Sequence, residues 1–175
     1  MHAHTGRIDA LVHRVPDAIF TLQRVALAIV SRAMDEGFVP AGKSGPSTGG
    51  YLCVAHADTG LPIIVLQLGE LPDAERAQRF LEVCQEKARR LAEYALSNGH
   101  TTSRESRDPD NGKYAGAFLL QHESARVILS FSGFPEMHDE GLVLAIALEA
   151  HLITEHEADV LAEHVGHTIH EVFSV

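Results

Sequence analysis

Apolar and polar positions along the chain follow two alternating periods, and these predict its elements in order. Apolar side chains recur at helical spacing in three segments, 18–36, 71–97 and 136–152. Between them lie two pairs of strand-like runs separated by short turns, 51–56 with 61–68 and 117–121 with 125–131. The predicted order is helix, β-hairpin, helix, β-hairpin, helix, which is typical of an α/β (α+β) domain with an antiparallel sheet.

Capping signals set the limits of the first two helices. Asp17 can cap the first helix and Gly37 ends it, and its apolar circumference predicts that it is well buried. Pro72 and Asp73 open the second helix, which Asn98-Gly99 ends. Its expected inward side is formed by Phe80, Val83, Cys84, Lys87, Leu91 and Ala95, and its more polar sides by Arg76, Arg79, Arg89 and Arg90.

The two ends of the chain are predicted to lie outside the central unit. Residues 1–16 contain His2, His4, Arg7 and Asp9 and predict a polar arm. Thr154-Glu-His-Glu157 fits a capping box at the start of an amphipathic last helix. The predicted parts are therefore an arm over 1–16, a domain over 17–153 and a C-terminal helix over 154–175.

The charge of the chain limits its partners. It has 14 Lys and Arg against 24 Asp and Glu, a net charge of −10 with neutral histidines. This balance argues against nucleic acid and anionic membranes, which attract clustered Lys and Arg. No stretch reaches the roughly 18 apolar residues of a transmembrane helix and the first residues do not form a signal peptide, so a cytoplasmic location is expected. Cys53 and Cys84 lack metal-ligand spacing and are expected to be buried free thiols.

Gly37-Phe-Val-Pro-Ala-Gly-Lys-Ser44 has the spacing of a phosphate-binding loop. That loop needs a strand before it and a helix after it, so that helix amides hold the phosphates. Here a helix precedes it, and the Gly- and Pro-rich residues up to Gly50 cannot begin one. The match is interpreted as coincidental, although binding of an anion without nucleotide hydrolysis stays open.

Histidines on the last helix form a candidate metal site. A helical projection places His156, Glu163, His167 and His170 together, opposite Ala158, Leu161, Val165, Ile169 and Val172. Zinc could use pairs at such spacing, but one helix does not close a tetrahedral site. The alternatives are a solvated polar face and an assembly that responds to protonation of histidine.

Two loops carry candidate ligand-binding side chains. Ser132 and Gly133 lie in a turn between a strand and a helix, where backbone amides favour an anion and His138 follows as a ligand or base. The helix dipole alone accounts for the acidic Asp139 and Glu140. The loop after the second helix offers His100 and Thr101. No nucleophilic triad is identifiable, so a catalytic role is not predicted.

The chain resembles the GlcG/HbpS family, the haem-degrading-domain superfamily. The resemblance rests on Ala26-Leu-Ala-Ile-Val-Ser-Arg-Ala33, the hairpin with Asp58-Thr-Gly60, Tyr114-Ala-Gly-Ala-Phe118 and the turn Phe131-Ser-Gly-Phe-Pro135 with the helix after it. It covers about 18–153 and is closest to an uncharacterised bacterial branch. It implies a profilin-like sheet with flanking helices, homo-oligomers, and in some members haem or corrinoid-related ligands.

These features together predict a small-molecule-binding protein of unknown function. The expected ligand is haem or another planar or anionic molecule, bound by His100, Thr101, Ser132, Gly133 and His138. The alternative is a homo-oligomeric structural or interaction module without catalytic activity. A third hypothesis is a metal-dependent enzyme that uses the histidines of the last helix.

Overall fold

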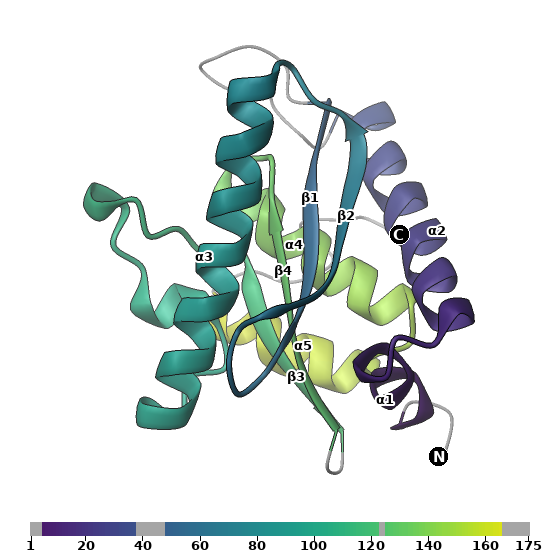
Figure 1. Ribbon diagram of the computed structural model, residues 1–175, viewed down its shortest axis with the longest axis vertical. Coiled ribbons are helices and arrows are strands. Elements are labelled where there is room, and N and C mark those ends of the chain that lie inside the picture. The colour runs from purple at the N-terminus through teal and green to yellow at the C-terminus, as the bar shows by residue number, and fades with distance from the viewer. Residues whose placement is uncertain (1–4, 38–47, 123–124, 166–175) are drawn as a thin grey trace.

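The computed structural model describes residues 5–37, 48–122 and 125–165 (Figure 1). Four antiparallel strands form one sheet in the order β2-β1-β4-β3. The strands are β1 (Thr48–His56), β2 (Pro62–Glu70), β3 (Ala117–His122) and β4 (Ala125–Ser132). The fold class predicted from the sequence, an antiparallel sheet built from two hairpins with flanking helices, is confirmed and is consistent with a profilin-like fold.

Helices cover both faces of this sheet. They are α1 (Thr5–Val12), α2 (Pro16–Asp35), α3 (Ala74–Asn98), α4 (Glu136–Glu149) and α5 (Glu155–Val165), with the 3-10 turns η1 (Ser103–Ser106) and η2 (Pro109–Asn111). On one face α3 packs on apolar side chains of the sheet such as Cys53, Ala117 and Ile128. The main core fills the other face, under α1, α2 and α4 (Figure 1).

The limits of α3 follow from its capping residues. The Asp73 side chain accepts a hydrogen bond from the amide of Arg76 at 2.8 Å, and Gly99 adopts a left-handed φ of 73° after the last turn. Both signals were predicted from the sequence and are confirmed. The prediction that Arg90 lies on a polar side is wrong, because this side chain is 5% exposed and bonded to the chain beside it.

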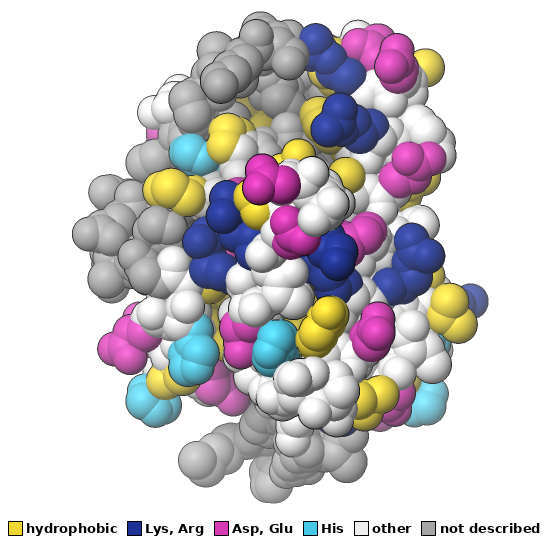
Figure 2. All heavy atoms as spheres, turned by 90° about the vertical axis from the view of Figure 1, so that its left-hand side faces the viewer, with side chains coloured by type: hydrophobic (Ala, Val, Ile, Leu, Met, Phe, Trp, Pro, Cys, Tyr) yellow, Lys and Arg dark blue, Asp and Glu magenta, His cyan; other side chains and the backbone are white. Residues whose placement is uncertain are grey.

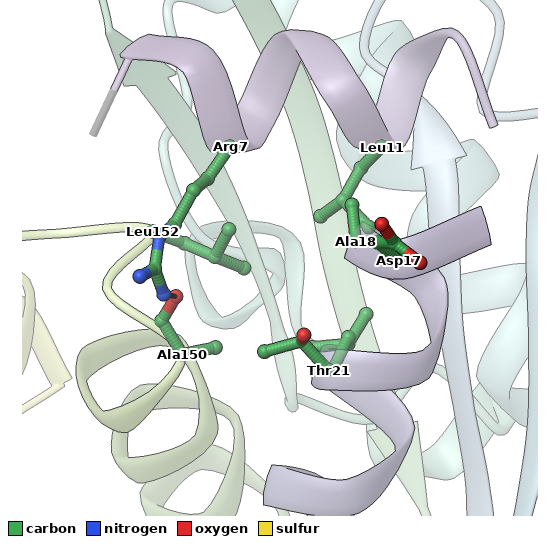
Figure 3. A pocket seen from close by; sticks show the side chains of 8 residues that line it. Arg7, Leu11, Asp17, Ala18, Thr21, Ala150 and Leu152 are labelled. Atoms are coloured by element: carbon green, nitrogen blue, oxygen red, sulfur yellow. Dashed lines mark hydrogen bonds between the residues drawn. The ribbon is translucent and has the colours of Figure 1, made fainter. Parts of the chain in front are cut away.

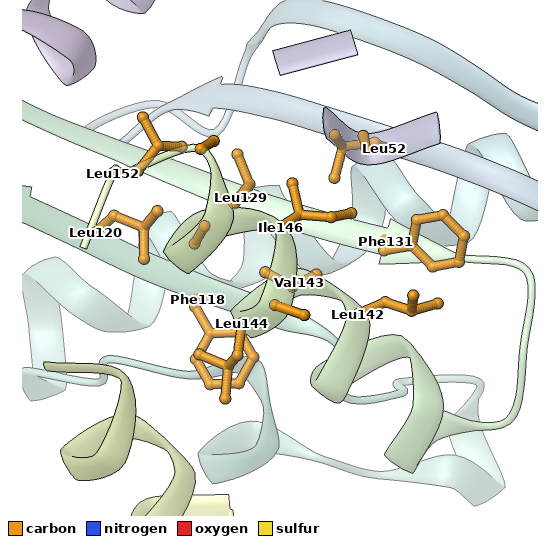
Figure 4. Close-up of a cluster of buried hydrophobic side chains, with 14 of the residues drawn as sticks. Leu52, Phe118, Leu120, Leu129, Phe131, Leu142, Val143, Leu144, Ile146 and Leu152 are labelled. Carbon is orange, nitrogen blue, oxygen red and sulfur yellow. The ribbon is translucent and has the colours of Figure 1, made fainter. Parts of the chain in front are cut away.

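The main core is built around α4 (Figure 4). Val143 and Ile146 of this helix pack with Leu129 and Phe131 of β4 and with Leu52 of β1. Its apolar residues lie on all sides because α4 lies between the sheet and α5. The helix ends at Glu149, three residues before the predicted end, and His151 then takes a left-handed φ of 54°.

Residues 5–12 form a helix where a polar arm was predicted. Ile8 is 0% exposed and Leu11 is 1% exposed, and both belong to the same core as α2 and α4. The polar residues of this segment obscured an apolar side at i, i+3, i+4 spacing, made by Ile8, Leu11 and Val12. The predicted arm is therefore wrong over these residues.

The start and the exposure of α2 also differ from the prediction. Its N-cap is Val15 and Pro16 is its first residue, because the fixed φ of proline suits the first helical turn. Asp17 therefore lies inside the first turn and is not the cap. Phe20 is 68% exposed and Leu27 is 38% exposed, so two large apolar side chains of the helix that was expected to be well buried face outward among polar residues.

The capping box at the start of α5 is confirmed. The Thr154 hydroxyl accepts from the amide of Glu157 at 3.2 Å, and the Glu157 carboxylate accepts from the amide of Thr154 at 2.7 Å. Ala158 and Val165 are buried in the main core. The apolar side of this helix is thus covered within its own chain as far as residue 165.

Candidate functional site

The predicted ligand residues lie in two separate places. The His100 ring stacks on Tyr94 with centroids 5.3 Å apart, and the Thr101 carbonyl accepts from the amide of Leu119 on the outer edge of β3 at 2.8 Å. Leu119 pairs with Ile128 of β4, whereas Ser132 lies four residues further along β4 and pairs with Tyr51. Four residues of strand span roughly 13 Å.

The turn that leads into α4 already holds carboxylates of the protein itself. The amide of Phe134 donates to Asp139 at 3.0 Å, and the amide of Ala115 donates to Glu136 at 2.6 Å. Gly133 packs so closely on β1 that a Cβ there would lie 2.4 Å from the carbonyl oxygen of Gly49. The turn brings Ser132, Gly133 and His138 together along the chain, but the amide of Phe134 donates to Asp139, and the amide of His138 donates to the carbonyl of Pro135.

A buried ion pair joins α3 to α4. Lys87 Nζ donates to Asp139 at 2.7 Å and to the carbonyl of Phe131 at 2.8 Å, and the two charged side chains are 1% and 3% exposed. Burial raises the pKa of Asp139 to about 6, although Lys87 and the amide of Phe134 lower it. Because solvent cannot reach either group, the pair joins the two helices inside the fold and is not a site for a substrate.

Arginines attach the segment between α3 and β3 to the helices on either side. Arg104 forms an ion pair with the buried Glu140 of α4, and Arg107 forms one with Glu136 at 2.8 Å. Arg90 of α3 donates to the carbonyls of Ser103 and Ser106 at 2.9 and 2.8 Å. On the face seen in Figure 2, Lys and Arg side chains lie among Asp and Glu side chains and form no separate basic patch.

Both cysteines are buried free thiols, as predicted. Burial raises the pKa of Cys53 to about 12 and that of Cys84 to about 11. Cys84 also lies 3.4 Å from the hydroxyl of Ser130. A thiol that stays protonated and buried is a poor nucleophile, so these cysteines have a packing role.

The structure covers half of the histidine face of the last helix. His156 and Glu163 are exposed on α5, and His167 and His170 lie outside the described residues. Within the described part of the chain, no group of three metal-ligating side chains comes together. The zinc site therefore stays a prediction.

A pocket that the sequence did not predict lies between α1, α2 and the turn from α4 to α5 (Figure 3). It is an open pocket of about 220 Å³, lined by Arg7, Leu11, Asp17, Ala18, Thr21, Leu22, Ala150 and Leu152. Arg7 of α1 reaches across the pocket wall, where its Nη1 donates to the carbonyl of Ala150 at 2.8 Å. One end of the pocket is therefore cationic, and most of its wall is apolar.

The pocket depends on the helix that was predicted to be an arm. Without α1 neither Arg7 nor Leu11 would have a fixed place beside α2. The apolar spacing of Ile8 and Leu11 is the sequence signal that could have revealed helix α1. The partner of Arg7 lies 143 residues away along the chain, and no local pattern indicates it.

Comparison with known proteins identifies no relative. No protein-family model matches the chain, and no curated protein is similar to it. None of the helices in the described ranges has the length and apolar content needed to cross a bilayer. The function must therefore be argued from the chain's own geometry.

Proposed function

We propose that this chain is a binding protein for a small apolar carboxylate, held in the pocket between α1, α2 and the α4–α5 turn. The resemblance to the GlcG/HbpS family, some members of which bind haem or corrinoid-related ligands, supports ligand binding. The pocket narrows the expected planar or anionic ligand to one with an apolar body and a negatively charged end.

The observation that carries this proposal is the position of Arg7. Its hydrogen bond to Ala150 fixes the guanidinium at the pocket wall through one nitrogen. A guanidinium has five N–H donors in a planar fork, so one such bond leaves the fork able to bind a carboxylate. Arg7 is half-buried, which strengthens an ionic hydrogen bond relative to one in open water.

The remaining lining residues define the rest of the ligand. Leu11, Ala18, Leu22 and Leu152 offer contacts for a hydrocarbon or a flat ring. Asp17 is exposed at another part of the lining and repels a second negative charge. The ligand that fits is therefore a monoanion with its charged group at Arg7.

Haem binding is a separate proposal that depends on other residues. The described residues that line the pocket include no His, Cys, Met or Tyr that could bind iron axially. Haem would require His100 or His138, and the purified protein can be titrated with haemin to test this. A Soret shift that is lost in the His100→Ala or His138→Ala variant supports haem binding, and no shift contradicts it.

The carboxylate site can be tested with 8-anilinonaphthalene-1-sulfonate as a fluorescent probe and decanoate as its competitor. Decylammonium serves as the competitor of opposite charge. With a net charge of −10, non-specific attraction favours the cation, so displacement by decanoate alone indicates a local cationic site. Arg7→Gln should weaken decanoate binding by about tenfold or more, and Arg7→Lys should retain part of it.

Two variants complete this experiment. Asp17→Asn removes the repulsion and should strengthen decanoate binding roughly twofold to fivefold. Arg24→Gln removes an exposed cation of α2 that does not line the pocket, and it should leave binding unchanged. Equal displacement by both competitors, or equal affinities in Arg7→Gln and Arg24→Gln, would overturn the proposal.

A further inference from the structure

Strand β2 forms one edge of the sheet, and β1 is its neighbour. Among the described residues no other strand pairs with it. Its sequence from Pro62 to Gly69, Pro-Ile-Ile-Val-Leu-Gln-Leu-Gly, contains no charged residue. Along an edge strand, alternate residues direct their N–H and C=O groups away from the sheet, and a long uncharged strand of this kind readily pairs with another chain.

The opposite edge of the sheet is covered by the chain itself. The Leu119 amide of β3 donates to the carbonyl of Thr101 at 2.8 Å, and Thr102 forms a β-bridge with Phe118. On β2, Pro62 stands at the first position and Gly69 near the end, so neither interrupts the central residues. The middle of β2 also lacks the lysine that commonly blocks an edge.

We propose that a second copy of this chain pairs antiparallel with β2 across a two-fold axis, which joins two four-stranded sheets into one. The row of donors and acceptors on one strand complements the same row after a two-fold rotation. Glu70 is the only charged residue of the strand. Pairing centred on Leu66 places Glu70 opposite Pro62 of the second copy, with the two Glu70 residues about 27 Å apart.

The helix beside this edge adds apolar surface to the same side of the molecule. α2 contacts β2 and runs next to it (Figure 1). It exposes Phe20 and Leu27 at 68% and 38%. Arg24 lies between these two residues on the exposed side of α2, so the apolar surface there is interrupted. A copy of the same chain brings an uncharged strand to this edge, whereas a highly charged partner strand would leave its charges without counterparts.

Solution mass measures this assembly directly. Light scattering of the full chain after size exclusion, at about 0.15 M salt to screen the two acidic copies, should give twice the 19.0 kDa chain mass. The variant V65K/Q67K places two lysines near the centre of the edge, at a half-buried and an exposed position, and should return the mass of one chain. Leu96→Lys changes an exposed leucine of α3 in the same way and should leave the dimer intact.

Hydrogen exchange of the unaltered chain gives a second readout that does not depend on the variant folding. In the dimer, the β2 amides that point away from β1 should exchange slowly, and dilution to the monomer should make them exchange at least tenfold faster. A monomeric wild-type protein would overturn the proposal. Fast exchange of these β2 amides in the dimer would also overturn the proposal. A dimer that persists in the folded V65K/Q67K variant would overturn it as well.

Discussion

Lys87 and Asp139 form a contact between two residues that lie far apart in the sequence. The pair is buried and links α3 to the start of α4 at a Nζ–Oδ2 distance of 2.7 Å. Because two buried charges have lost their hydration, their attraction mainly compensates for that loss. The pair is therefore costly to break and less costly to replace as a whole.

We predict a non-additive pair of substitutions at this position. Lys87→Met should lower the free energy of unfolding by about 3–5 kcal/mol, because the buried Asp139 loses its counter-charge and must either stay charged without a partner or take up a proton. The double variant K87M/D139L should recover most of that loss, because apolar side chains of similar size can fill the site. Urea unfolding of the wild type, both single variants and the double variant measures this coupling. Additive effects of the two substitutions would contradict it.

The same carboxyl group gives a pH dependence of stability. Burial raises the pKa of Asp139 from 3.8 to about 6, so between these values the folded protein holds a proton that the unfolded chain has lost. The contribution of Asp139 to stability should therefore fall as the pH rises from about 4 to about 6 and stay constant above that. The difference in unfolding free energy between wild type and Asp139→Asn should change by about 3 kcal/mol over this range. A difference independent of pH would show that Asp139 keeps its ordinary pKa.

The sequence placed Lys87 on the inward side of its helix but indicated nothing about its partner. Asp139 lies 52 residues away, and the helix dipole alone accounted for its position in the first turn of α4. Glu140 was interpreted in the same way, and its partner Arg104 lies on a segment without periodicity. Ion pairs between distant segments depend on how the elements pack, which local patterns do not show.

Among the elements, α1 is the one whose role differs most from its predicted role. It is short, and its stability comes from packing Ile8 and Leu11 into the core. Leu11→Ala should lower the free energy of unfolding by about 2–5 kcal/mol, measured by urea unfolding. Val12→Ala, at a half-buried position of the same helix, is the control and should cost less. No effect of Leu11→Ala would indicate that the segment is an arm after all.

The hairpin turn of β1 and β2 lies directly against α3 at Gly60. Gly60 has a φ of 65°, and a Cβ there would lie 2.4 Å from Cα of Arg89. Gly99 has a similar φ of 73° with open space around it. Gly99→Ala should cost about 1–2 kcal/mol for the left-handed backbone, and Gly60→Ala about 1–3 kcal/mol more for the clash. Thermal unfolding of the two variants measures these losses of unfolding free energy. Equal losses in Gly60→Ala and Gly99→Ala would contradict the close packing of Gly60 on α3.

At the scale of the whole molecule, the sequence predicted the two hairpins and the helices between them. Apolar periods and capping residues such as Asp73 and Gly99 are local, and the structure confirms what they indicated. The proposed pocket could not be predicted in this way, because its lining comes from residues 7–22 and 150–152. Of the residues predicted from the sequence, His100 follows the end of α3 and stacks on Tyr94, and His138 lies in the first turn of α4, where its amide donates to the carbonyl of Pro135.

The central claim is that an apolar carboxylate binds between α1, α2 and the α4–α5 turn. Amide chemical shifts of the isotope-labelled protein during a titration with decanoate locate the ligand without prior assumption about its site. The proposal predicts saturable shifts at residues 7–22 and 150–152, which are absent in Arg7→Gln and present in Arg24→Gln. Shifts centred on residues 100–101 and 132–138, or none at saturating decanoate, would contradict it.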